Sequence, residues 1–239
     1  MNKYYSMLFA LIWVHPNPLN AQAAVEYTLE FKASANGLSA TAERSFKIIT
    51  NQTYQLTNSL QASIGGQIIS NIEQVSVLTA NTKGFTPISY SNTQTGVIAK
   101  KQVINYDRDN MIAISSEDDE SWAISLTAET YDELSHQLAL RQSFIENSPK
   151  LKFEVIDDNE IEIYHYQVLG KEKISTPLGN FNSTKLGRIR EKDENTNTIF
   201  WLANDWEFLL IRMEQTNSGL TTVLELSHGM VSGQELEPL

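Results

Sequence analysis

The sequence predicts a mainly β protein, built as a single strongly curved antiparallel sheet or an open or half β-barrel, with one α-helix packed against it. Apolar and polar residues alternate along most of the chain, as in Tyr27–Ala33 (YTLEFKA). Turn signals such as Asn36-Gly37 recur at intervals of about ten residues, which is the spacing of a meander. Only one segment of the chain has the period of a helix.

That segment predicts a helix over residues 131–146. Thr130 and Glu133 have the spacing of a capping box, in which each side chain bonds a free amide at the start of a helix. Apolar residues recur at helical spacing from Leu134 onward, and Pro149 stops the pattern.

Some later strands are apolar on both faces. Ile199–Leu202 and Phe208–Ile211 show no polar alternation. A strand buried on both sides suits a curved sheet that is covered inside and out, or one that wraps around the helix.

The N-terminal 23 residues resemble a cleavable signal peptide. Lys3 precedes a short apolar run at Met7–Val14, and Ala21-Gln22-Ala23 offers small residues where a signal peptidase cuts, which would leave Ala24 first. The alternative is a buried N-terminal helix, which the prolines that follow the run disfavour. We therefore expect a signal peptide at 1–23, a single β-rich domain at 24–232 and a flexible tail at 233–239.

Composition restricts the function classes. The 239 residues include no cysteine, which excludes disulfides, thiolate catalysis and cysteine-ligated zinc. A net charge of −11 disfavours nucleic acid as a partner, and no later apolar run is long enough to span a membrane. An exported chain without disulfides is typical of the bacterial periplasm, where we expect a soluble protein.

No catalytic or metal motif is present, so we expect neither enzyme activity nor a cofactor or metal. The chain has no GxSxG elbow and no HExxH spacing, and the histidines after the signal peptide, His136, His165 and His228, are far apart. His165 shares strand parity with Ile161 and Ile163, which predicts an inward-facing core histidine. A catalytic triad assembled by the fold is the least favoured alternative.

Two groups of side chains are candidates for ligand binding. The aromatic residues would line a cavity or groove for an apolar or glycan ligand of the envelope, and the arginines, which share even parity, would contact a carboxylate or phosphate of the ligand. Core packing of the aromatics and surface ion pairs of the arginines are the alternatives. The candidates are Tyr164, Tyr166, Trp201, Trp206 and Phe208, with Arg188, Arg190 and Arg212.

Five segments in series resemble a known family. They are Leu134–Arg141 (LSHQLALR), Tyr164–Glu172 (YHYQVLGKE), Ile174–Phe181 (ISTPLGNF), Phe200–Asp205 (FWLAND) and Leu210–Gln215 (LIRMEQ).

Over residues 131–228 the chain is similar to the bacterial exported family labelled domain of unknown function 3108. That family often has an aromatic residue in place of His136 and a proline in place of Leu210. The resemblance implies a periplasmic, mainly antiparallel β fold, similar to half-barrels that carry lipids or lipoproteins. It supplies no catalytic residues.

The function expected from the sequence is a non-catalytic binding or carrier module for a hydrophobic or envelope-derived ligand, held in a concavity lined by Trp201, Trp206 or Phe208. The alternative is a structural or interaction protein of the cell envelope, with a filled barrel and no small ligand. The sequence predicts no oligomeric state.

Overall fold

The computed structural model describes residues 24–35, 38–65, 67–81, 84–96, 99–190 and 196–239. These residues form one 16-stranded sheet, one α-helix and a short 3₁₀ helix. The predicted signal peptide at 1–23 and the predicted Asn36-Gly37 turn lie outside the described residues.

The strands follow in chain order. They are β1 (Tyr27–Ala35), β2 (Leu38–Thr50), β3 (Thr53–Ile64), β4 (Gln67–Asn81), β5 (Gly84–Gly96), β6 (Lys100–Asp107), β7 (Ile112–Glu117), β8 (Glu120–Ser125), β9 (Thr130–Asp132), β10 (Lys152–Asp157), β11 (Glu160–Ser175), β12 (Asn180–Ile189), β13 (Thr196–Ala203), β14 (Leu209–Asn217), β15 (Leu220–Val231) and β16 (Gln234–Glu235). The helix α1 spans Ser135–Ile145, and the 3₁₀ helix η1 spans Asn204–Trp206.

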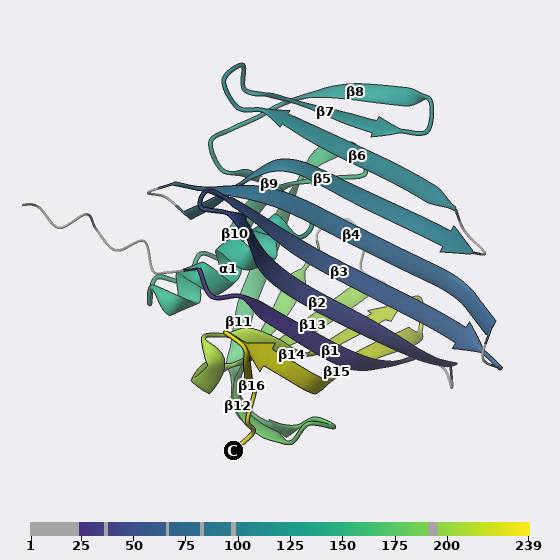
Figure 1. Cartoon of the computed structure of the whole chain (residues 1–239), viewed down its shortest axis with the longest axis vertical. Helices are drawn as coiled ribbons and strands as arrows, with labels where there is room; N and C mark the ends of the chain where they lie inside the picture. Colours follow the sequence, from purple (N-terminus) through teal and green to yellow (C-terminus); the bar gives the residue numbers. More distant parts are fainter. Residues whose placement is uncertain (1–23, 36–37, 66, 82–83, 97–98, 191–195) are drawn as a thin grey trace, which may run out of the picture.

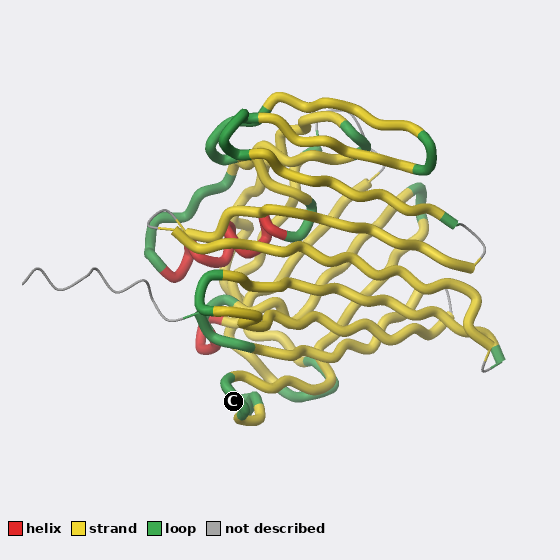
Figure 2. Tube along the Cα trace, turned by 45° about the horizontal axis from the view of Figure 1, so that its top comes forward, coloured by secondary structure: helices red, strands yellow, loops and turns green. Residues whose placement is uncertain are grey.

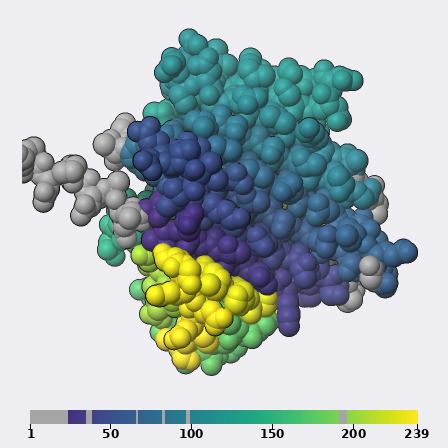
Figure 3. Space-filling model, in the orientation of Figure 1, coloured from purple at the N-terminus to yellow at the C-terminus, as the bar shows by residue number. Residues whose placement is uncertain are grey.

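Two meanders share this sheet. Strands β1 to β8 follow one another as neighbours, and so do β10 to β15, while the pairing of β1 with β15 joins the two halves. Every pairing is antiparallel except the one between β9 and β10. The space-filling view shows the junction, with the yellow C-terminal strands beside the purple N-terminal strand (Figure 3).

The sheet bends around α1 without closing (Figures 1 and 2). Its edge strands are β8 and β9, and the helix contacts β9 at one edge as well as β5, which is far from β9 in the strand order. Register shifts between Glu30 and Phe31 and between Trp201 and Leu202 mark bulges, which increase local bending. The predicted fold class, a mainly antiparallel and strongly curved open sheet with one packed helix, is confirmed.

Side chains hold the end of the curled sheet against its middle. Asp132, at the end of β9, is fully buried and accepts a hydrogen bond of 2.9 Å from Ser76 Oγ on β4. Its other oxygen accepts from the backbone amides of Leu134 and Ser135, at 2.9 and 2.8 Å. Next to it, the hydroxyl of Tyr90 on β5 donates to Glu133 Oε2 at 2.7 Å. One carboxylate thus caps the helix and joins β9 to β4.

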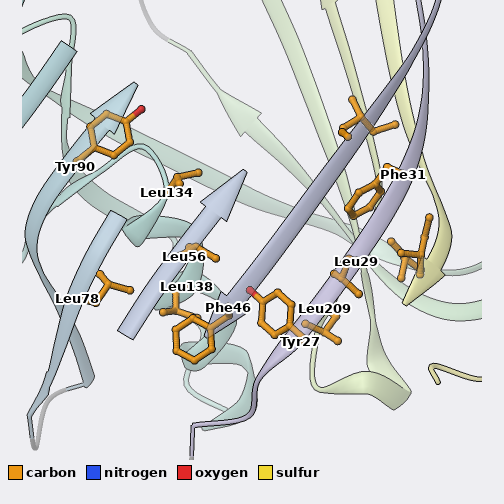
Figure 4. Packing of buried hydrophobic residues seen from close by; sticks show 14 of the residues in the cluster. Tyr27, Leu29, Phe31, Phe46, Leu56, Leu78, Tyr90, Leu134, Leu138 and Leu209 are labelled. Carbon is orange, nitrogen blue, oxygen red and sulfur yellow. The ribbon is translucent and has the colours of Figure 1, made fainter. Parts of the chain in front are cut away.

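The main hydrophobic core fills the concave side of the sheet. It includes residues from β1 to β8, from β10 and β12 to β15, and from α1, as well as Leu134 directly before the helix. Leu29, Leu56, Leu78 and Leu134 are fully buried in it (Figure 4). A second cluster lies between the end of the helix and β10 to β13, with Leu140 and Phe144 from the helix facing Tyr164, Tyr166 and Leu202.

The helix begins later than the capping-box pattern predicts. Thr130–Asp132 pairs with β10 as a strand, which uses the backbone that a helix from residue 131 would need. Asp132 bonds the first helical amides, and Ser135 Oγ accepts from the amide of Asp132 at 2.9 Å. The cap is therefore formed by Asp132 and Ser135 instead of Thr130 and Glu133.

The C-terminal residues, predicted as a flexible tail at 233–239, contact the sheet. Gln234–Glu235 pairs with β15, Leu236 is buried, and the amide of Leu239 donates to the carbonyl of Asn180 at 2.9 Å. Among the described residues, no helix has the length and apolar character that crossing a membrane requires.

Candidate ligand cavity

A mostly apolar cavity lies between α1 and the strands at the junction of the two halves of the sheet. Ten of its thirteen lining residues are hydrophobic, and three are polar. They are Tyr27, Leu29, Leu138, Leu140, Tyr166, Phe200, Leu202, Phe208, Leu209 and Leu210, with Arg44, Gln137 and Arg141. The free space is narrow, about 30 Å³ for the centres of water-sized molecules, which is room for about two waters.

Strand and helix periodicity place these side chains. Residues two apart on a strand face the same side, so Tyr27 and Leu29 of β1, like Phe200 and Leu202 of β13, enter the cavity together. The helix contributes Gln137 and Arg141, which are one turn apart on the same face, together with Leu138 and Leu140.

Arg44, on β2, is the most unusual lining residue because it is a buried arginine that has no carboxylate partner among the described residues. Its residue is only 6% exposed, and its Nη1 donates to Gln137 Oε1 at 2.6 Å. A guanidinium has five N–H donors, and among the described residues no ion pair or second hydrogen bond engages the others. Burial of an unpaired charge is unfavourable unless a counter-charge is supplied.

Arg141, on α1, has a partner that is partly exposed. Its Nε donates to the carbonyl of Glu207 at 2.8 Å, and its Nη2 lies 3.1 Å from Glu207 Oε2. The guanidinium also stacks on the ring of Tyr27, 5.4 Å from the centroid. Burial lowers the pKa of Arg141, the charges of Tyr27 and Glu207 raise it, and the positive charge of Arg44 lowers it further.

The turn that carries Glu207 adopts an uncommon backbone. Glu207 and Phe208 have φ angles of 48° and 57°, in the left-handed region that bulky residues rarely occupy. The amide of Phe208 donates to the carbonyl of Ala203 at 2.8 Å, and its ring packs 5.2 Å from that of Phe144. Arg141 therefore holds a strained turn that places Phe208 in the cavity wall.

Tyr166 connects the cavity to a buried histidine. Its hydroxyl lies 2.7 Å from His136 Nε2, and His136 Nδ1 lies 3.1 Å from the carbonyl of Asp132. The carbonyl can only accept, so Nδ1 carries the proton and Nε2 accepts from Tyr166. Burial lowers the pKa of His136 to about 3, and burial raises the pKa of Tyr166.

The aromatic candidates from the sequence divide between two locations. Tyr166 and Phe208 line the cavity, and Tyr164 packs behind it in the second cluster. Trp201 faces the other side of β13, where its Nε1 donates to Glu172 Oε1 at 2.6 Å. Trp206 Nε1 donates to the carbonyl of Glu237 at 3.0 Å. Of the three residues expected to line the concavity, Phe208 therefore lines this cavity and Trp201 and Trp206 do not.

The arginine candidates do not converge either. Arg188 lies over the ring of Tyr164, with its Cζ 3.2 Å from the centroid, and Arg190 donates to Thr198 Oγ1 at 2.9 Å. Arg212 pairs with Trp201 across β13 and β14 and bonds Glu225 Oε1 at 2.7 Å. Even residue numbers do not place these arginines on one face of the sheet. Residues paired across neighbouring strands face the same side, and Arg188 pairs with Thr198, whereas Arg212 pairs with the odd-numbered Trp201.

The inward orientation expected for His165 is wrong as well. Tyr164 and Tyr166 are buried, so His165 faces outward with Ile161 and Ile163, and Ile163 is 59% exposed. Within the described part of the chain, no cluster of histidine, aspartate and glutamate side chains could hold a metal ion.

Arg44 and Arg141 were not identified from the sequence. Arg44 has the parity of the buried Ala42 and Phe46, so it is a charged residue on the apolar face of its strand. That pattern is the signal that could have identified it. The role of Arg141 depends on the turn at Glu207, which no local pattern links to the helix.

We predict that His136 makes the free energy of unfolding depend on pH. Its pKa falls from 6.5 to about 3 on folding, so the unfolded chain binds the proton first as the pH drops. The stabilising contribution is complete above pH 6.5 and is lost toward pH 3, at roughly 1.4 kcal/mol per pH unit. Urea unfolding of the wild-type protein should show this loss relative to His136→Gln.

The matched control is His165→Gln, on the outward face, which should keep the wild-type pH dependence. Parallel stability curves for the wild-type protein and His136→Gln would contradict a neutral, buried His136.

Comparison with known proteins agrees with this fold. A crystal structure of a beta-barrel-like protein of domain of unknown function DUF1849 from Brucella abortus is similar, with a TM-score of 0.57 and 10% sequence identity. The match covers 87% of this chain and 98% of that one, and at this identity it shows the fold alone. No curated protein matches the chain. The family model described as "Protein of unknown function (DUF3108)" matches residues 25–225, so the similarity extends through the N-terminal strands, and the chain belongs to this family.

Proposed function

We propose that this protein is a non-catalytic binding or carrier module, and that the cavity beneath α1 takes the apolar part of a small hydrophobic ligand. The observation that carries the proposal is the lining of the cavity, with ten hydrophobic residues and three polar ones that gather on the Arg44 and Gln137 side. Binding sites for small molecules commonly combine apolar walls with a few polar groups that fix orientation.

Entry of a ligand requires the wall to move, because the free space of about 30 Å³ is smaller than an alkyl chain. Phe200, Phe208 and Leu210 are the half-buried apolar residues of the wall, and Phe208 belongs to the strained turn. Rotation of the Phe208 side chain would open the cavity without disturbing the fully buried Leu29. The ligand would then replace the contacts that Phe208 makes with the cavity.

The proposal predicts that affinity for straight-chain alcohols rises with chain length. Each buried methylene contributes about 0.8 kcal/mol, which is about fourfold in the dissociation constant. Calorimetric titration with hexanol, heptanol and octanol should show this increment. Leu210→Trp, which fills the mouth, should reduce affinity for all three alcohols.

The matched control is Leu220→Trp, a change at an exposed leucine at the start of β15, which should bind as the wild-type protein does. Absence of binding in the wild-type protein, or equal loss in both variants, would reject the cavity as a ligand site. It would favour the alternative of a structural protein with a filled barrel.

We also propose that the protein is exported to the periplasm and that residues 1–23 are removed. The support is the apolar run at Met7–Val14 followed by Ala21-Gln22-Ala23. N-terminal sequencing of the protein from a periplasmic fraction should give Ala24 as the first residue. Ala23→Arg should block cleavage, because the peptidase reads a small residue there. Recovery of the whole chain, with Met1, from the cytoplasm would contradict export.

A further inference from the structure

We propose that the ligand carries an anionic head group, a carboxylate or a phosphate, which binds between Arg44 and Arg141 while its alkyl chain occupies the cavity. This inference rests on the proposed function and adds the chemical class of the ligand. The occupant is a single-chain anionic amphiphile.

The charged residues that line the cavity are all positive. Two guanidinium groups line the cavity, and none of its thirteen lining residues is acidic. The one carboxylate beside them, that of Glu207, bonds Arg141 and has a side chain that is 47% exposed. The cavity is therefore short of a negative charge on the Arg44 side.

The positions of the two guanidiniums also suit an anion. Arg44 comes from β2 and Arg141 from α1, so the two guanidiniums approach the cavity from separate elements. Gln137 accepts from Arg44 Nη1 and holds the guanidinium in place, while the rest of its planar fork has no protein acceptor among the described residues. Carboxylate and phosphate oxygens match such a fork, with two parallel hydrogen bonds.

Glu207, the partner of Arg141, can be displaced by a ligand. The Glu207 carboxylate is partly exposed and belongs to the strained turn beside Phe208, so an incoming anion can replace it at Arg141 Nη2. The same replacement removes one of the two contacts between Arg141 and this turn, while the bond from Arg141 Nε to the Glu207 carbonyl remains. Entry of the head group thereby loosens the turn that carries Phe208.

The net charge of the protein is opposite in sign to the charge of this cavity. At a net charge of −11 the protein repels anions in general, so a preference for an anionic ligand has to come from a local site. A cationic head group would meet two positive charges and no carboxylate except Glu207.

The test compares ligands that share one chain length. Octanoate, octyl phosphate, octanol and octyltrimethylammonium are titrated into the full chain at pH 7 and followed by calorimetry. We expect the two anions to bind about tenfold or more tighter than octanol, as charge-assisted hydrogen bonds provide, and the cation to bind weakest. The two anions separate a carboxylate site from a phosphate site.

Two variants test the arginine. Arg44→Met should remove the preference for anions and leave octanol binding unchanged. Its control is Arg212→Met, which breaks an ion pair on β14 beside Trp201, and which should change neither the preference for anions nor octanol binding. Glu207→Gln removes a competing carboxylate from the surface and should strengthen octanoate binding severalfold, and Glu214→Gln is its control. This second variant decides the matter if Arg44→Met does not fold.

The outcomes separate the two proposals. Equal affinity for octanol and octanoate, with Glu207→Gln unchanged, would overturn the anionic head group and leave the hydrophobic cavity standing. Failure of all four ligands to bind would overturn both. A preference for octanoate that survives Arg44→Met and does not respond to Glu207→Gln would place the anion elsewhere.

Discussion

The buried carboxylate of Asp132 is the constraint on which the rest of the structure depends. An open sheet of sixteen strands has no hydrogen-bonded closure, and the far end of this one returns to its middle only through side chains. Asp132 bonds Ser76 on β4 and also the first amides of α1, so one group fixes both the curl of the sheet and the start of the helix. Burial raises the pKa of Asp132, whereas the hydrogen bonds from Ser135 and Ser76 lower it, so the carboxylate depends on these donors.

The chemistry of the cavity follows from that placement. A helix that begins at Ser135 directs Gln137, Leu138 and Arg141 toward β1, β2 and the turn before β14. Apolar side chains from both halves of the sheet then meet two guanidiniums, and among the described residues only that of Arg141 has a carboxylate partner, the exposed side chain of Glu207. An apolar wall with a localised excess of positive charge is complementary to an anionic amphiphile, in a protein whose overall charge is negative.

Much of the fold could be predicted because period-two alternation records which side of each strand is buried. Alternation cannot specify how far a sheet curls or which strands meet across the interior, so the contact of β9 with β4 was not predictable. The candidate site was predicted only in part. Tyr166 and Phe208 lie in the cavity, but Trp201 faces away because it follows Phe200 directly on the strand. Arg44 and Arg141 come together through tertiary packing of β2 against α1, which leaves no local sequence pattern.

Urea unfolding of Asp132→Ala beside Asp109→Ala tests the central claim most directly, since Asp109 is an exposed carboxylate in the turn between β6 and β7. The account predicts that Asp132→Ala lowers the free energy of unfolding by about 3 kcal/mol or more, because two amides and a hydroxyl lose their acceptor in the interior. Asp109→Ala should leave it nearly unchanged. Equal stability of the two variants would contradict the claim that this carboxylate holds the curled sheet around its helix.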